Sequence, residues 1–262
     1  MRVMLTAGFD RSAATVALGE LLRRDGHTVT GAIVVSPFRL ARLRSEVRRR
    51  GVGFVGTAAR RLLGRRAAGP GGPLERFLAD AGVRHRSLRL WCREHGIACT
   101  RVGGLNDETT VEQVRTAAPD LVLYGGGGIV RRSFLEASRR RVLNAHSGPL
   151  PEIRGMNACE WSLLLGLPCA VTVHFIDERI DTGPIVERIP VPVERGDTID
   201  TLRERCVVAG LDGLRRAVQL GILSAPARPG AERHRQCYLL APALLELAEL
   251  ALIRRVASAG RK

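Results

Sequence analysis

The first third of the chain changes its hydrophobic spacing in a regular order. Residues 2–7 form a short apolar run, and residues 28–35 alternate and are rich in β-branched side chains, so both predict strands. Between them, apolar residues recur at helical spacing from Ser12, a predicted helix cap, to Arg24. This β-α-β order predicts a mostly parallel, Rossmann-like α/β sheet with helices on both faces.

The same reading continues to the end of the chain. Further strands are predicted at 98–102, 121–124, 142–144, 169–176 and 184–193, and further helices near 87–95, 109–117, 133–137, 161–165, 199–220 and 242–256. Asn157 with Glu160 predicts a capping box for the helix near 161–165, and Asp197 is predicted to cap the long one. Pro190 and Pro192 place the last strand at a sheet edge.

Residues 37–85 interrupt this order. Two arginine-rich stretches, 38–50 and 52–66, show helical spacing and are followed by the flexible link AAGPGGP at 67–73. One interpretation is an inserted helical hairpin with solvated arginines, and the other is a basic arm over an anionic acceptor or a membrane surface. The predicted domains are a core over 1–200 with this insertion, and a C-terminal helical extension over 201–262 packed on the core.

Composition narrows the class of protein. The 262 residues are 45% hydrophobic, which is ample for a buried core. No apolar run approaches the roughly 20 residues of a membrane span, and the start of the chain does not resemble a signal peptide, so we expect a cytoplasmic protein. The six cysteines include no Cys-x-x-Cys, so no metal site is predicted, and Cys159 is interpreted as a small buried residue rather than a nucleophile.

The net charge of +15 would ordinarily indicate phosphate-bearing partners. Lys262 is the only lysine, however, so nearly all of the basic charge is arginine, a bias that a GC-rich genome also produces. The charge is therefore discounted as a sign of nucleic-acid binding.

Candidate chemistry gathers at the ends of two predicted strands. Asn144 and His146 are two residues apart, so on a strand their side chains point to the same face. The loop after the strand containing His174 supplies the carboxylates of Asp177 and Asp181. Two donors to an oxyanion and one proton acceptor are the minimum set for acyl transfer to a nucleophile.

Two glycine-containing segments also follow strands. The first turn, Ala7 to Ser12, has the single glycine Gly8 and is not G-x-G-x-x-G, which disfavours a dinucleotide cofactor. The run from Gly125 to Gly128 lets main-chain groups approach a flat heterocycle closely.

The motifs after Leu143 together resemble those of folate-dependent formyltransferases, a family that includes glycinamide ribonucleotide, methionyl-tRNA and sugar N-formyltransferases. The matching motifs are Asn144-Ala-His146, Leu150-Pro151, Arg154-Gly155, Val171-Thr-Val-His174 and Asp181-Thr-Gly183-Pro184. The resemblance covers about residues 1–35 and 86–200. It implies a formyltransferase fold, 10-formyltetrahydrofolate as the donor, no metal, and an amine as the acceptor.

The resemblance also implies roles for individual residues. Asn144, His146 and Asp181 are the implied catalytic residues. The implied donor site comprises Gly125, Gly126, Gly127, Gly128, Ile129, Val130, His174, Ile176 and Asp177. The implied acceptor site comprises Gly8, Phe9, Asp10, Ser147 and Arg154.

Two departures from the family pattern bear on the acceptor. The turn at Gly8 lacks the Gly-Asn-Gly-Ser loop of purine-pathway members, and the tail is shorter than the β-barrel of tRNA-directed members. We therefore expect a small acceptor, an amino sugar on a nucleotide or a secondary-metabolite amine. The alternatives are a methionyl-tRNA formyltransferase-like enzyme, a 10-formyltetrahydrofolate deformylase, which we expect to carry a further amino-terminal domain, and a folate- or nucleic-acid-binding relative without activity. The sequence does not determine the oligomeric state.

Overall fold

A seven-stranded, mostly parallel sheet organises the molecule, as the alternating pattern predicts. The computed structural model describes residues 1–36, 71–226 and 236–259. The strand order is β3-β2-β1-β4-β5-β7-β8, in which β5–β7 and β7–β8 are the antiparallel pairs. The strands of this sheet are β1 (Arg2–Ala7), β2 (Thr28–Val35), β3 (Cys99–Val102), β4 (Leu121–Gly125), β5 (Val142–His146), β7 (Ala170–Phe175) and β8 (Ile185–Pro190).

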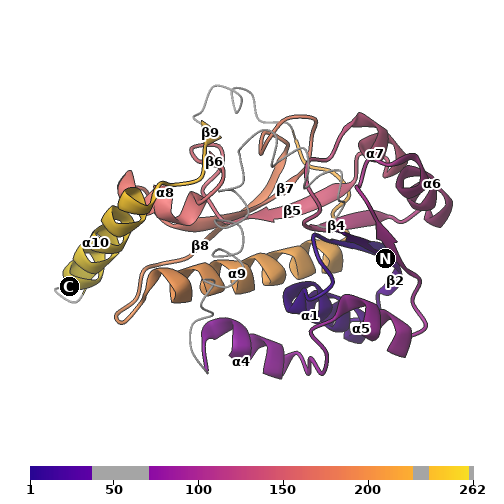
Figure 1. The fold of residues 1–262 in the computed structure, drawn as a ribbon, viewed down its shortest axis with the longest axis horizontal. Coiled ribbons are helices and arrows are strands. Elements are labelled where there is room, and N and C mark those ends of the chain that lie inside the picture. Colours follow the sequence, from indigo (N-terminus) through magenta and orange to yellow (C-terminus); the bar gives the residue numbers. More distant parts are fainter. Residues whose placement is uncertain (37–70, 227–235, 260–262) are drawn as a thin grey trace, which may run out of the picture.

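Helices cover both faces of this sheet (Figure 1). One face packs against α1 (Ala13–Arg24), α5 (Leu88–Glu94) and α9 (Ile199–Gln219) around a core that includes Leu5 and Leu143. The other packs against α6 (Glu108–Ala117) and α7 (Arg132–Ala137) around Met4 and Val142. Neighbouring residues of a strand thus enter opposite cores, the period-2 alternation of a sheet that is buried on both faces.

The C-terminal region adds a smaller layer. A short sheet pairs β6 (Arg154–Gly155) with β9 (Gln236–Cys237). Helix α10 (Pro242–Ala259) lies beside α8 (Ala158–Leu164), and its Ala248 and Leu252 join a core shared with α8 and α9 (Figure 1). Helix α9 also lies across β5, because Gly210 leaves space for Ala145.

Local details differ from the sequence-based expectations. Thr198, not Asp197, caps α9, and it forms a capping box with Thr201. Asn157 precedes α8 in a left-handed conformation and makes no side-chain cap; its amide instead donates to Glu160. Ser12 is at the cap position of α1, but its hydroxyl contacts that of Thr15.

Helix α4 (Pro73–Asp80) was not predicted, because it is only eight residues long and follows the glycine-rich link directly. It begins with proline, which suits the first helical turn, and buries Leu78 against α1. The predicted helices at 38–50 and 52–66, and the proposed membrane contact of that insertion, lie outside the described residues. Within the described residues, no helix has the length and apolarity that crossing a membrane requires.

Candidate functional site

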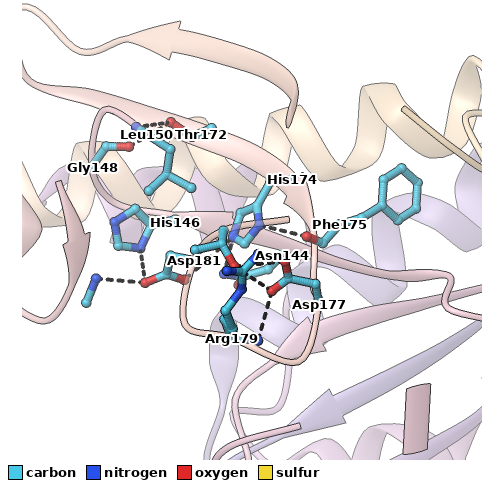
Figure 2. A network of polar contacts seen from close by, with 12 residues as sticks. Asn144, His146, Gly148, Leu150, Thr172, His174, Phe175, Asp177, Arg179 and Asp181 are labelled. Atoms are coloured by element: carbon cyan, nitrogen blue, oxygen red, sulfur yellow. Dashed lines mark hydrogen bonds and ion pairs between the residues drawn. The ribbon is translucent and has the colours of Figure 1, made fainter. Parts of the chain in front are cut away.

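Strands β5 and β7 place three polar side chains side by side. Their antiparallel register sets Asn144 directly opposite His174, and His146 opposite Thr172. Leu143 and Ala145 face the core beneath α9, so Asn144 and His146 point to the other face of the sheet. Figure 2 shows these side chains and Asp181 directed toward one another.

The loop after β7 brings Asp181 to this group. Its carboxylate oxygens lie 3.5 Å from His146 Nδ1 and 3.7 Å from His174 Nε2. The amide of Gly155 donates to the same carboxylate at 2.8 Å. Asp181 has a φ of 53°, in the left-handed region that aspartate and asparagine tolerate better than most residues. The carboxylate of Asp181 is therefore positioned by the backbone conformation of its own turn and by the Gly155 amide of β6.

Burial and hydrogen bonds fix the state of His174. The side chain is 1% exposed, and burial is the main cause that lowers its pKa to about 4, so the ring is neutral near pH 7. Its Nδ1 lies 2.9 Å from the carbonyl of Phe175, which can only accept, so Nδ1 carries the proton. Nε2 is then an acceptor for the amide of Asn144 at 3.1 Å. His174 therefore orients the side chain of Asn144, and the second N–H of the Asn144 amide remains available to another acceptor.

The ring of His146 is fixed in the same way. Its Nε2 lies 3.0 Å from the carbonyl of Ile153 and donates to it, so Nδ1 faces Asp181. A Cβ on Gly148 would come within 2.8 Å of this ring, so the loop fits closely around it. Thr172 anchors that loop: its hydroxyl donates to the carbonyl of Gly148 at 2.7 Å and accepts from the amide of Leu150 at 3.0 Å.

The glycine loop lies at the end of the neighbouring strand β4. Gly126, Gly127 and Gly128 all have positive φ values, between 97° and 127°, which glycine adopts at little cost. The hydroxyl of Thr6 donates to the carbonyl of Gly126, and that of Tyr124 donates to the carbonyl of Gly128. The loop thus presents backbone without side chains and is held at two points.

The far end of this loop is also fixed. The Asn106 amide donates to the carbonyl of Ile129 and its oxygen accepts from the amide of Arg131, at 2.8 Å each. Ile129 is 62% exposed beyond the bare loop. Exposed backbone beside one apolar side chain suits a flat heterocycle.

Several predicted binding residues lie elsewhere or are otherwise engaged. The side chain of Val130 is buried in the core with Phe134, so it does not line the loop. The carboxylate of Asp177 accepts from the Thr182 hydroxyl and the Arg179 amide, so it shapes the turn that carries Asp181.

Two of the predicted acceptor-site residues make contacts within the protein. Asp10 accepts from the Ser87 hydroxyl and the Arg89 amide, which ties the first turn to α5. Arg154, which the resemblance places in the acceptor site, is buried in β6. Of the other predicted residues, Ile176 packs against the core beside α7, Ser147 is half-buried next to His146, and Gly8 and Phe9 lie in the first turn, with Phe9 exposed.

The pattern of the sequence did not reveal the positioning residues Thr6, Asn106, Tyr124 and Thr172. Each is a common residue in an otherwise ordinary strand or turn. Two of them carried a usable signal, since Tyr124 directly precedes the glycine run and Thr172 stands in the motif Val171-Thr-Val-His174. Burial is the largest cause that raises the pKa of Tyr124, so its hydroxyl remains a donor.

No group of side chains suited to a metal ion occurs among residues 1–36, 71–226 and 236–259. Cys159 is buried in the apolar core between α8 and α9 together with Cys169 and Cys206. This environment fits a packing role for Cys159.

The fold and this site define an α/β protein in which a carboxamide, an imidazole and an acid meet where β5 and β7 pair. The chain belongs to the formyl transferase family, whose family profile matches residues 14–218. It is 29% identical over 125 residues to a methionyl-tRNA formyltransferase from Geobacillus sp. (strain WCH70), covering 47% of this chain and 39% of the relative. It is 35% identical over 120 residues to that of Halorhodospira halophila, covering 45% of this chain and 38% of the relative. The matches thus span less than half the length of these relatives.

Solved structures share the fold. The phosphoribosylglycinamide formyltransferase of Anaplasma phagocytophilum has a TM-score of 0.58 at 21% identity, covering 84% of this chain and 86% of its own. A sugar N-formyltransferase from Shewanella sp. has a TM-score of 0.57 at 15% identity, covering 96% of this chain and 87% of its own.

Proposed function

We propose that this protein transfers the formyl group of 10-formyltetrahydrofolate to the amine of a small acceptor. The observation that carries the proposal is the convergence of Asn144, His146 and Asp181. Backbone carbonyls hold the rings of His146 and of the neighbouring His174. The donor supplies an activated formyl carbonyl. The bare loop from Gly125 to Gly128 and the exposed Ile129 fit its flat ring system.

The three residues have distinct roles in this proposal. The free amine of the acceptor attacks the formyl carbon, and a negative charge develops on the formyl oxygen. Asn144 donates its remaining N–H to that oxygen. Because His146 Nε2 already donates to Ile153, its second donor is Nδ1, which carries a proton when the ring is charged.

Asp181 lies 3.5 Å from His146 Nδ1, so its carboxylate stands next to the reacting groups. It also accepts the proton that the attacking amine loses and passes it, through a water molecule, toward the leaving nitrogen of the donor. The carbon–nitrogen bond to the acceptor forms as the bond to the donor nitrogen breaks, so one amine exchanges the formyl group with another.

A nucleotide-linked amino sugar or a secondary-metabolite amine is the proposed acceptor. The first turn has one glycine and directs Asp10 toward α5, so its backbone does not form a glycine-rich cradle for a ribonucleotide phosphate. The similarity to methionyl-tRNA formyltransferases favours tRNA as the second candidate, although it covers only part of those relatives.

The test is a screen of amines with 10-formyltetrahydrofolate, followed by mass spectrometry. The panel comprises nucleotide-linked amino sugars, free amino sugars, glycinamide ribonucleotide and methionyl-tRNA, and formate is measured in parallel. We expect one nucleotide-linked amino sugar or small amine to gain a formyl group. Formate release without any acceptor would identify a deformylase, and neither product from any mixture would refute the proposal.

A further inference from the structure

A cavity of about 810 Å³ lies along α5 and the first turn. Its volume is within the roughly 300–1,000 Å³ typical of small-molecule sites. Leu90 and Ile97 form an apolar part of its wall. Its basic lining consists of Arg11, Arg84, Arg86, Arg89, Arg93 and His85.

The charge of this arginine pocket, meaning the cavity with these five arginines, is only partly neutralised. Arg86 pairs with Glu75 at 3.3 Å, and Arg84 reaches Glu94 at 4.0 Å, and both pairs are exposed. Exposed ion pairs of this kind contribute little free energy and leave the arginines accessible to another anion. Within the described part of the chain, Arg11, Arg89 and Arg93 form no ion pair.

The arrangement within α5 adds to this imbalance. Arg89 and Arg93 are one helical turn apart, so their like charges lie on one side of the helix and repel each other. Among the described residues of the lining, the one carboxylate is that of Asp10, and it already accepts from the Ser87 hydroxyl and the Arg89 amide. A bound anion would relieve this repulsion.

The pocket adjoins the proposed donor loop through the first turn. A Cβ on Gly8 would lie 3.3 Å from the backbone of Gly127, so the turn touches the glycine loop. Asp10 and Arg11 line the pocket two and three residues further on, at most about 11 Å of chain from Gly8. A ligand that crosses this turn can therefore reach from the pocket toward the glycine loop.

We propose that the arginine pocket binds the phosphoryl groups of the amine acceptor, which makes the acceptor a nucleotide-linked or otherwise phosphorylated small amine. This inference rests on the proposed formyl transfer. Arginine guanidinium groups bind phosphate oxygens in bidentate pairs, and Leu90 and Ile97 offer an apolar surface for a ring next to them.

The test compares two double variants of the full chain. Arg89→Gln/Arg93→Gln removes two pocket charges, and Arg195→Gln/Arg254→Gln removes two exposed charges outside the pocket. Binding of inorganic pyrophosphate is measured by calorimetry. We expect the pocket variant to bind pyrophosphate at least about tenfold more weakly than the parent, because each charge-assisted hydrogen bond to phosphate contributes substantially, and the control variant to match the parent.

Formyl transfer is measured in the same proteins. The pocket variant should show a KM for a phosphorylated amine raised about tenfold, while the KM for an amine without phosphate stays unchanged. Equal pyrophosphate binding by both variants, or no binding by the parent, would overturn the pocket assignment and leave formyl transfer standing. Arginine-dependent pyrophosphate binding without any formyl transfer would refute the proposed function but keep the anion site. Transfer RNA displacing pyrophosphate while phosphorylated small amines do not would overturn the small-acceptor assignment.

Discussion

The site at β5 and β7 and the arginine pocket are built in opposite ways. His146 and His174 are buried, and each donates a ring N–H to a backbone carbonyl. Arg89 and Arg93 are exposed on one helix. Catalytic groups must keep a fixed geometry relative to the reacting carbonyl, so they need rigid surroundings. Groups that attract a phosphate act mainly through their charge, so they tolerate motion. Changes at the first site should therefore alter kcat, and changes at the second should alter KM.

The largest expected effect follows removal of a reacting group. Asn144→Ala, His146→Ala and Asp181→Asn should each lower kcat for formyl transfer by about 100- to 1,000-fold, the usual cost of losing an oxyanion donor or its proton acceptor. Asparagine keeps the left-handed backbone at 181, so the fold should survive. Rates are compared with those of Glu178→Gln, a change in the same turn at an exposed ion pair. Nearly full activity in His146→Ala would show that His146 does not take part in formyl transfer.

The next effect tests whether His174 orients Asn144. His174→Ala removes the acceptor of the Asn144 amide, so kcat should fall by tens of fold, less than in Asn144→Ala because the donor itself remains. The KM of the acceptor should change little. His174→Gln keeps an acceptor atom and should lose less activity than His174→Ala; equal losses would argue against orientation.

Burial of His174 also predicts a dependence of stability on pH. Its pKa is about 4 in the folded chain against an ordinary value of 6.5, so the unfolded chain binds the proton more readily between these values. The contribution of the neutral His174 to the free energy of unfolding is therefore fully present above pH 6.5 and is lost as the pH falls toward 4. At about 1.4 kcal/mol per pKa unit, this loss is a few kcal/mol. Urea unfolding at several pH values measures it, and His174→Gln should flatten the slope over this window.

A smaller effect is expected at the loop anchor. Thr172→Val keeps the shape but leaves the Gly148 carbonyl and the Leu150 amide without the hydroxyl, which should cost about 1–3 kcal/mol of unfolding free energy. Because the loop surrounds the ring of His146, kcat should also fall, by about tenfold at a cost of about 1.4 kcal/mol to the barrier. Thr172→Ser keeps the hydroxyl and should retain both the unfolding free energy and kcat. A Thr172→Val variant that matches the parent in both quantities would show that Thr172 does not anchor the loop.

The smallest effect concerns the arginine pocket. Raising ionic strength from about 0.1 M to about 1 M shortens the screening length from about 10 Å to about 3 Å. The KM of a phosphorylated acceptor should therefore rise several-fold while kcat stays nearly constant. Steady-state rates at several salt concentrations measure this. A salt dependence that appears in kcat instead would mean that the two regions are not separate in function.

Much of the fold was predictable because its strands are short apolar runs between clear turns. Residues 2–7, 28–35 and 121–124 form strands near the predicted positions. Cap residues were not predictable at the same level, because neighbouring polar residues compete for the same amides. Asp197 and Thr198 are both good caps, and only the geometry at the start of α9 decided for Thr198.

The sequence alone determined the family motifs and the side chains available for chemistry, since Asn144, His146 and Asp181 occur at a specific spacing. The tertiary structure decided which neighbours hold them. Ile153 and Phe175 act through backbone carbonyls, which leave no signature in a sequence, and Gly155 of the Arg154-Gly155 motif acts through its backbone amide. It also decided that Asp10 faces α5 and that Arg11 joins the arginines of residues 84–93 around one cavity, because segments distant along the chain meet only when the sheet and its helices are packed.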